Sequence, residues 1–245
     1  MIMISLCRMD NAIILDYIRE QLWNNIDEET KKSAQRYFKE QITSHGVKTS
    51  IVTKISKESY RMMNGFEKKK IFSVAEELLQ SGYIEESFIS FKWAEYLSKD
   101  FEKHDFDILE RWLSEYVTNW ASCDTLCNHA IGTIVEMFPD YLPRLKQWTS
   151  SDNRWVRRGA ATTLILPARK GLFLKEVLEI ATLLLKDTDD LVQKGYGWML
   201  KETSKTHQQE VFDFIMKHKK SMPRTALRYA IEKMPKEVRK TLMQK

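Results

Sequence analysis

One short stretch of the chain, NWASCDTLCNH from Asn119 to His129, holds most of the residue types that do chemistry in proteins. A tryptophan, a carboxylate, two cysteines and a histidine fall within it. Such a set could bind a metal ion, supply a thiol nucleophile, or place a carboxylate among aromatic rings. The spacing of these residues and the rest of the sequence distinguish these three possibilities.

Metal and thiol chemistry are the weakest of these interpretations. Structural zinc commonly takes four Cys or His ligands in two close pairs, and Cys123, Cys127 and His129 have no second pair downstream. On a helix the two cysteines share a face that Ile131 and Ile134 continue, which favours small side chains in a hydrophobic core. His129 is offset by two residues and faces elsewhere, so it is not placed to activate either thiol. We therefore expect no metal and no cofactor.

Asp124 and the tryptophans have structural roles open to them as well. A carboxylate accepts hydrogen bonds from the free amides at a helix start, so Asp124 could cap a helix over residues 124–137. Trp120, and Trp198 in GYGWMLKE, could equally be buried anchors. The residue types alone do not separate these roles from catalysis.

The elements that must position these residues are helices. Only 8 of the 245 residues are Gly and 5 are Pro, and apolar residues recur at helical spacing almost everywhere. Three later segments, PDYLPRLKQW, PRTALRYAIEKM and PKEVRKTLMQK, each begin with a proline, which the first turn of a helix accepts. We predict an all-α protein with helices at about residues 12–23, 28–44, 48–62, 66–80, 84–98, 105–119, 124–137, 139–149, 153–167, 172–185, 187–203, 205–219, 223–233 and 235–244.

Many amphipathic helices in tandem, joined by short connectors, are typical of stacked helix pairs of the HEAT or armadillo type, whose period is about 40 residues. One internal echo supports this, because SSDNRWVRRGAATTL and DTDDLVQKGYGWMLKE both run from an acidic turn into an apolar and basic helix. We predict a right-handed superhelical solenoid of HEAT-like helix pairs, in a single domain over residues 1–245. A compact helical bundle is the alternative.

The charge of the chain is distributed unevenly. Residues 1–143 hold 17 Lys and Arg against 23 Asp and Glu, whereas residues 144–245 hold 22 against 11. A strongly basic part suggests a polyanion as partner, most often nucleic acid.

No apolar stretch approaches the roughly 20 residues of a membrane span, and three cysteines at Cys7, Cys123 and Cys127 make no disulfide framework. We expect a cytoplasmic monomer that does not bind membranes.

Three separated motifs together resemble one family. NWASCD with a Trp four residues before the Asp, then SDNRWVRR, then QKGYGWMLKE, occur in the order found in the AlkD family of DNA alkylation repair glycosylases, which are built from HEAT-like repeats. AQRYFKEQITSHGVKT, Ala34 to Thr49, is similar to a further stretch of that family, so the resemblance spans about residues 30–205. It implies duplex DNA with alkylated bases as the partner and alkylated purines as the substrate.

The resemblance also implies roles for individual residues. Asp124 corresponds to the family's carboxylate, which stabilises an oxocarbenium-like sugar and positions water, and Trp120 and Trp198 match two tryptophans that flank the deoxyribose. Arg158 falls where the family keeps an arginine near the lesion, and Tyr37 and Thr49 match positions near DNA. Further candidates for phosphate contacts, from their charge alone, are Arg154, Arg157, Lys194 and Lys201.

The sequence therefore leaves two alternative functions. The first is a monofunctional DNA glycosylase that hydrolyses the N-glycosidic bond of N3- or N7-alkylated purines and leaves an abasic site; no lysine stands out for Schiff-base lyase chemistry. The second is a non-catalytic HEAT-repeat scaffold for DNA, RNA or protein, in which Asp124 is only a helix cap.

Overall fold

A computed structural model of the protein describes residues 11–244, which form helices, turns and one isolated β-bridge between Thr43 and Tyr83. The predicted all-α fold class is confirmed. The chain forms two compact units, one that ends at Leu97 and one that begins at Ser98, while the single domain over residues 1–245 stays a prediction. Within the described residues, no helix has the length and apolar character needed to cross a membrane.

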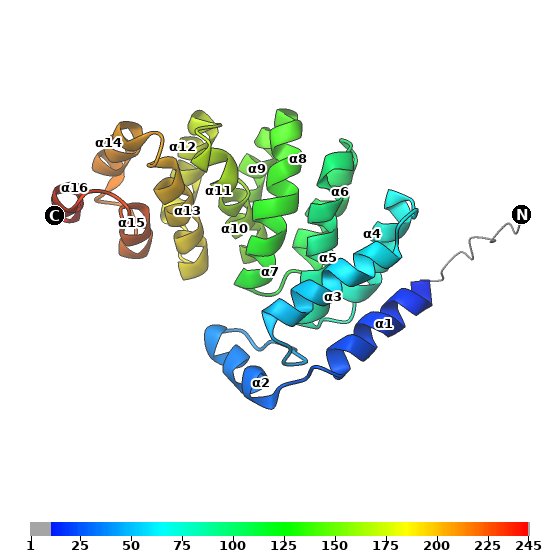
Figure 1. Ribbon diagram of the computed structural model, residues 1–245. Coiled ribbons are helices and arrows are strands. Elements are labelled where there is room, and N and C mark those ends of the chain that lie inside the picture. Colours follow the sequence, from blue (N-terminus) through cyan, green and yellow to red (C-terminus); the bar gives the residue numbers. More distant parts are fainter. Residues whose placement is uncertain (1–10, 245) are drawn as a thin grey trace, which may run out of the picture. The chain divides into compact units, whose positions relative to one another are not determined.

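The first unit is a small group of packed helices (Figure 1). Its helix α5 packs against both α3 and α4, and α1 contacts the same two helices. The buried Trp93 of α5 fixes this packing, because its indole Nε1 donates to the carbonyl oxygen of Ser56 in α3 at 3.0 Å. The elements are α1 (Asn11–Trp23), α2 (Glu28–Ala34), the short 3₁₀ helix Gln35–Tyr37, α3 (Thr49–Met62), α4 (Lys68–Leu79) and α5 (Ile84–Tyr96).

The helix predicted over residues 28–44 is wrong in its second half. Helix α2 ends at Ala34, and the chain after Tyr37 reaches α3 without further helix. Within the part that is not helical, the side-chain amide of Gln35 donates to the carbonyl oxygen of Glu40 at 2.9 Å, and its oxygen accepts from the N–H of Ile42 at 3.2 Å. The carbonyl oxygen of Thr43 accepts from the N–H of Ile84, about 40 residues later in the chain, at 3.0 Å. These groups are therefore bonded outside a helix, and directly after them the carboxylate of Glu85 accepts from the backbone N–H groups of His45, Gly46 and Val47 at 3.1, 2.9 and 3.2 Å.

The second unit is a stack of helices in which four helices contact one another in succession (Figure 1). We call α7 (Trp120–Thr125), α10 (Arg154–Thr162), α13 (Asp190–Thr203) and α15 (Arg224–Ala230) the central row. Other helices, among them α6 (Asp105–Glu115), α9 (Leu142–Trp148), α12 (Leu174–Leu183), α14 (Gln208–His218) and α16 (Lys236–Met243), alternate with them along the chain. The helices of the central row begin at Trp120, Arg154, Asp190 and Arg224, so their starts lie 34, 36 and 34 residues apart. The echo seen in the sequence therefore corresponds to two neighbouring helices, α10 and α13.

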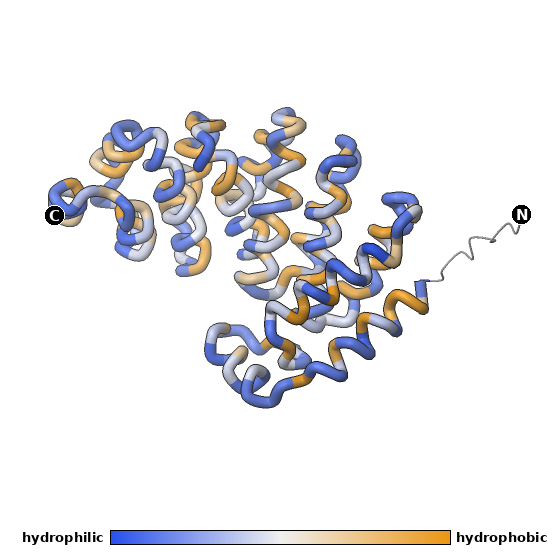
Figure 2. Tube along the Cα trace, viewed as in Figure 1, coloured by the Kyte–Doolittle hydropathy of each residue, from blue (hydrophilic) through white to orange (hydrophobic). Residues whose placement is uncertain are grey.

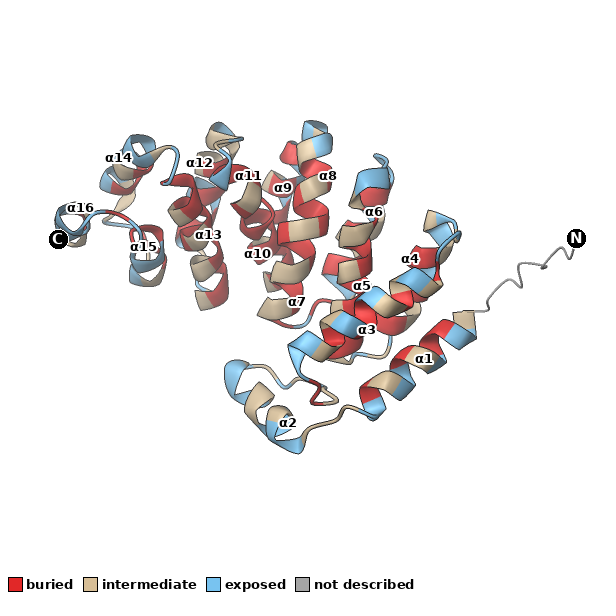
Figure 3. Cartoon of the chain, viewed as in Figure 1, coloured by how far each residue is buried: buried red, intermediate tan, exposed pale blue. Residues whose placement is uncertain are grey.

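Each helix of the second unit turns an apolar face inward. Figure 2 shows hydrophobic and hydrophilic residues mixed along the helices of this unit, and Figure 3 shows buried residues in its interior. Most residues of α10 and α13 are buried. The elements are the 3₁₀ helix Ser98–Asp100, α6 (Asp105–Glu115), α7 (Trp120–Thr125), a π-helical turn (Leu126–Ile131), α8 (Gly132–Met137), the 3₁₀ helix Pro139–Tyr141, α9 (Leu142–Trp148), α10 (Arg154–Thr162), α11 (Ile165–Arg169), α12 (Leu174–Leu183), the 3₁₀ helix Leu184–Lys186, α13 (Asp190–Thr203), α14 (Gln208–His218), α15 (Arg224–Ala230) and α16 (Lys236–Met243).

Candidate active site

The helix that carries Asp124 begins four residues earlier than predicted. Asn119 has an extended backbone and its side-chain oxygen accepts from the N–H of Ser122 at 2.9 Å, so Asn119 is the cap and Trp120 the first helical residue. A capping role for Asp124 at the start of a helix over residues 124–137 is thus wrong. Asp124 lies in the second turn, four residues after Trp120, which places both on one face of the helix.

A π-helical turn, Leu126–Ile131, follows Asp124 almost directly. Helix α7, this turn and α8 run on without interruption, so residues 120–137 form one long helix with a widened turn in the middle. Turns of this kind are rare in helices and are frequently found at functional sites. The π-helical turn is therefore consistent with a functional site on this helix.

Asp124 is bound by Arg158 of the next helix in the central row. The guanidinium Nε donates to carboxylate Oδ1 at 2.9 Å and Nη2 donates to Oδ2 at 2.8 Å, a bidentate pair. The remaining nitrogen, Nη1, donates to the carbonyl oxygen of Leu191 in α13. A single arginine in α10 therefore joins α7 to α13.

Burial controls the electrostatics of this pair. The side chain of Arg158 is 6% exposed and that of Asp124 is 14% exposed, so the carboxylate keeps more contact with solvent. Burial raises the pKa of Asp124 above its ordinary value, and the charge and hydrogen bonds of Arg158 offset only part of this rise. Burial alone lowers the pKa of Arg158, but the Asp124 carboxylate more than compensates and the net shift is upward. Arg158 thus stays charged.

Helix α13 approaches Arg158 closely because it has a glycine there. A Cβ on Gly195 would lie 3.3 Å from Cγ and 3.5 Å from Nη1 of Arg158. Trp198 follows Gly195 by three residues, on the same side of the helix. Trp120 and Trp198 are both partly buried, so each keeps part of its surface accessible. The ion pair between Asp124 and Arg158 thus joins α7, which also bears Trp120, to α10. The hydrogen bond of Arg158 to Leu191 joins α10 to α13, which bears Trp198.

The other predicted phosphate contacts are all engaged in ion pairs within the second unit. Arg154 binds Asp189 at 2.9 Å and lies over the ring of Trp155. Arg157 binds Asp187 at 2.7 Å, and Lys194 binds Asp190 at 3.2 Å. Lys201 binds Glu232 at 3.0 Å. Three of these pairs link successive layers of the stack, a role that sequence reasoning missed because the acidic partners lie 30 to 35 residues away.

Tyr37 and Thr49 belong to the first unit. Tyr37 ends the 3₁₀ helix after α2 and is 73% exposed, which excludes a core position for it. Thr49 is the exposed first residue of α3. Their contacts with DNA stay a prediction.

The cysteines of the stretch are core residues. Cys123 and Cys127 are both fully buried, as the spacing predicted, and burial raises the pKa of the Cys123 thiol well above its ordinary value. Cys7 lies outside the described residues. Within residues 11–244, no group of three His, Cys, Asp or Glu side chains is arranged to hold a metal ion.

The sequence of this chain matches the model of one protein family, described as DNA alkylation repair enzyme, over residues 18–234. The match covers most of the chain, including every residue of the site described above. The chain belongs to the DNA alkylation repair enzyme family. A comparison with curated proteins gives no match.

Solved structures agree with the family's helical architecture. The chain is similar to a predicted DNA alkylation repair enzyme from Enterococcus faecalis, with a TM-score of 0.77 and 19% identity over 86% of this chain and 97% of that one. It is also similar to the alkylpurine DNA glycosylase AlkC of Pseudomonas fluorescens bound to DNA that contains an abasic site analog, with a TM-score of 0.55 and 14% identity over 96% of this chain and 66% of that one. A Streptococcus mutans protein gives a TM-score of 0.53 and 17% identity over 90% and 96% of the two chains. At these identities the likeness concerns the fold.

One helix lies beyond the part of the chain that matches the DNA alkylation repair family. The match ends at residue 234, whereas α16 spans Lys236–Met243. The central row also continues past the predicted site. The fifth residue of each of its helices is charged: Asp124 in α7, Arg158 in α10, Lys194 in α13 and Arg228 in α15. Arg228 is not among the predicted site residues.

Proposed function

We propose that the chain is a monofunctional DNA glycosylase that releases purines alkylated at N3 or N7 from duplex DNA and leaves an abasic site. Membership of the DNA alkylation repair family supports the repair class. The observation that carries the catalytic assignment is Asp124 itself, a carboxylate that keeps some exposure, shares a helix face with Trp120 and is held by a buried arginine.

The chemistry suits one fixed carboxylate. A purine alkylated at N3 or N7 carries positive charge, so the electron pair of the C1′–N bond leaves with the base and the base departs neutral. The sugar left behind resembles an oxocarbenium ion, and water then forms the new C1′–O bond and passes its proton to the Asp124 carboxylate, which returns it to solvent. In this proposal the Asp124 carboxylate stabilises the cation and orients the water, and no group has to protonate the leaving base.

Arg158 acts here as a positioning residue. A carboxylate offers about four lone-pair directions, and the bidentate bond occupies two of them. The other two stay available for water and for the sugar cation. Because the guanidinium is itself anchored on the Leu191 carbonyl, Asp124 is held before substrate arrives. Trp120 and Trp198 would flank the sugar, since aromatic faces favour positive charge.

The contacts with DNA are proposed from charge. For Arg154, Arg157, Lys194 and Lys201 to bind phosphates, each would either share its acidic partner or release it. Tyr37 and Thr49 are proposed as further contacts from the first unit. Duplex DNA is the proposed partner, and we expect the protein to act as a monomer.

The test uses a duplex that carries a single 7-methylguanine, with the released base detected by mass spectrometry under single-turnover conditions. The wild-type protein should release the base, and Asp124→Asn should lower the rate by about 100-fold or more. Because this substitution leaves a buried arginine without its charge partner, it will also lower stability. A matched control is therefore needed.

Asp187→Asn is that control. Asp187 binds Arg157 at 2.7 Å and its side chain is 8% exposed, so its replacement breaks a similar ion pair between α10 and the start of α13. With enzyme in saturating excess over the duplex, so that a change in DNA affinity through Arg157 does not affect the rate, the control should release 7-methylguanine at the wild-type rate at a temperature where both variants are folded. If Asp124→Asn keeps the wild-type rate, or if both variants lose it equally, the catalytic role of Asp124 is wrong.

One observation favours a binding protein without catalysis. Asp124 and the four predicted phosphate-contacting cations are all paired within the chain, as residues of a purely structural network would be. In that case wild-type protein would release no base from any N3- or N7-alkylated duplex. Its binding would fall steeply with salt if the partner is nucleic acid, and would be insensitive to salt if the partner is another protein.

A further inference from the structure

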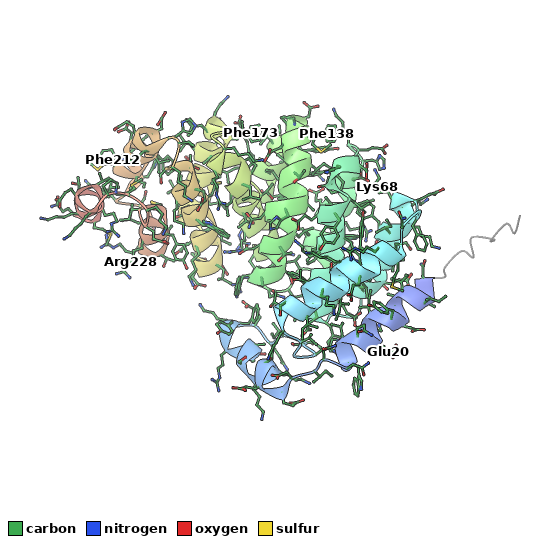
Figure 4. The ribbon with its side chains drawn as sticks, viewed as in Figure 1. Glu20, Lys68, Phe138, Phe173, Phe212 and Arg228 are labelled. Carbon is green, nitrogen blue, oxygen red and sulfur yellow. The ribbon has the colours of Figure 1, made fainter. Side chains whose placement is uncertain are left out.

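The groove between α15 and α16 collects positive charge at the C-terminal end of the second unit. It has a volume of about 420 Å³. We call it the C-terminal groove and define it by its lining residues, which are Arg228, Ile231, Glu232, Lys236, Arg239, Lys240 and Met243. Figure 4 labels Arg228 on α15, at the edge of this unit.

The four cations of this groove differ from those around Asp124. Arg228, Lys236, Arg239 and Lys240 are exposed, and none of them forms an ion pair with an acid of residues 11–244. The one acid in the lining, Glu232, is already bound by Lys201 at 3.0 Å and by Lys233 at 3.4 Å. The positive charge of the C-terminal groove is therefore available to a ligand, whereas that of the arginines in α10 is engaged.

The groove is also tied to the helix that bears Trp198. Helix α15 packs against α13 so closely that a Cβ on Gly197 would lie 2.7 Å from both the Ala226 carbonyl oxygen and Cβ of Tyr229. Arg228 occupies the same helical position in α15 as Arg158 does in α10 and Lys194 in α13.

We propose that the C-terminal groove binds the sugar–phosphate backbone of duplex DNA to one side of the lesion, and that α16, which lies beyond the family match, extends the DNA contact of this chain. The proposal rests on the proposed function for the lesion, although the groove would bind undamaged duplex equally well. Four cations without acidic partners, set around Ile231 and Met243, suit a polyanion with apolar sugar faces. Because phosphates have the same charge at every base pair, binding that rests on these cations should be independent of sequence.

The test is the salt dependence of binding to an undamaged duplex, measured by fluorescence anisotropy with the full chain. The triple variant Lys236→Gln, Arg239→Gln and Lys240→Gln removes three positive charges from α16 and should bind more weakly than wild type at low salt. The slope of log affinity against log salt should become shallower by about 0.9 for each phosphate that is no longer neutralised, or by about 2 to 3 in all.

The matched control removes three exposed lysines elsewhere in the second unit. The side chains of Lys103, Lys170 and Lys175 are all well exposed, but each is paired with an acid, unlike the cations of the groove. The variant with all three changed to Gln has the same net charge as the α16 variant. It should keep the wild-type slope. If both variants change the slope equally, the effect is one of net charge and the proposal is wrong.

A second variant covers the case in which α16 detaches when its charges are removed. Arg228→Gln lies on α15, leaves α16 unchanged, and should make the slope shallower by about 1, whereas Arg228→Lys should restore it. An unchanged slope in both the triple variant and Arg228→Gln would overturn the proposal. So would binding to vesicles of anionic phospholipid that needs the same cations while the affinity for DNA is unchanged.

The outcomes separate this proposal from the proposed function. Base release from a saturating excess of enzyme should be the same in the triple variant and in wild type, because Asp124 does not line the groove. Protein that binds DNA through the groove but releases no base would contradict the glycosylase assignment alone. Protein that releases base with an unchanged salt slope in the variants would contradict the groove alone.

Discussion

Arg158 binds both carboxylate oxygens of Asp124, at 2.9 and 2.8 Å, and the same guanidinium holds the carbonyl oxygen of Leu191. Three helices of the central row therefore meet at one side chain. Because the pair is largely buried, its two charges depend on each other more than charges at the surface do. Stability and the proposed catalysis are thus coupled at this residue.

Replacement of Arg158 should be severe. Arg158→Met leaves the Asp124 carboxylate buried without its partner, so the free energy of unfolding should fall by about 3 to 5 kcal/mol, as measured by urea denaturation. Arg144→Met is the control: Arg144 also binds a carboxylate twice, that of Glu110, but it is 53% exposed. Its loss should lower the free energy of unfolding by about 1 kcal/mol or less. Equal losses in the two variants would contradict the importance of burial at Arg158.

The pH dependence of base release should report Asp124. Burial raises the pKa of Asp124 above its ordinary value, and the proposed chemistry needs the ionised form. Base release should therefore be constant at neutral pH and should decline, as pH falls, at a higher pH than an ordinary aspartate would give. The measurement is the single-turnover rate against pH, corrected for base loss without enzyme.

The same shift has a consequence for stability. The folded state binds a proton at Asp124 more readily than the unfolded chain does, so the contribution of this group is favourable below the ordinary pKa of 3.8 and is lost as pH rises through the raised pKa. Asp124→Asn should remove this component from the pH dependence of the free energy of unfolding. If instead base release declines only near the ordinary pKa of an aspartate, the pKa of Asp124 is not raised, and neither this prediction nor that for base release holds.

Much of this architecture could be predicted from local sequence. The helix predicted over residues 84–98 is observed as Ile84–Tyr96, and α15 and α16 begin directly after Pro223 and Pro235, close to where proline suits a helix start. These signals are local, because they consist of the spacing of apolar residues and of a single proline at the start of a helix. They were sufficient for the fold class.

What could not be predicted depends on contacts between distant residues. The loop before α3 is bonded to Glu85, about 40 residues later in the chain, which binds its amides. The pairing of Arg157 with Asp187 depends in the same way on how two layers stack. For Asp124 the missing signal was Asn119, which caps the helix several residues earlier than Asp124 would.

Gly195 should be important for the position of Arg158. Alanine at this site would gain up to about 1 kcal/mol in helix propensity, but its Cβ would lie 3.3 Å from Cγ of an arginine that three hydrogen bonds hold in place. We expect Gly195→Ala to lower base release several-fold with little gain in stability. Gly197→Ala is the contrast, since its Cβ would meet the backbone of Ala226 at 2.7 Å and should lower the free energy of unfolding by about 1 to 3 kcal/mol. A stabilised Gly195→Ala variant with full activity would contradict this role.

The buried thiols should be inert in the native protein. Cys123 and Cys127 have no accessible surface for solvent or reagent, and burial raises the pKa of Cys123 well above its ordinary value. In a Cys7→Ser variant, Ellman's reagent should detect no thiol in the folded state and both remaining thiols after unfolding in guanidinium. Base release should be unchanged after exposure of the folded variant to the reagent. Reaction of one thiol in the folded state, together with loss of base release, would instead assign the chemistry of this stretch to a cysteine and remove Asp124 from the centre of the mechanism.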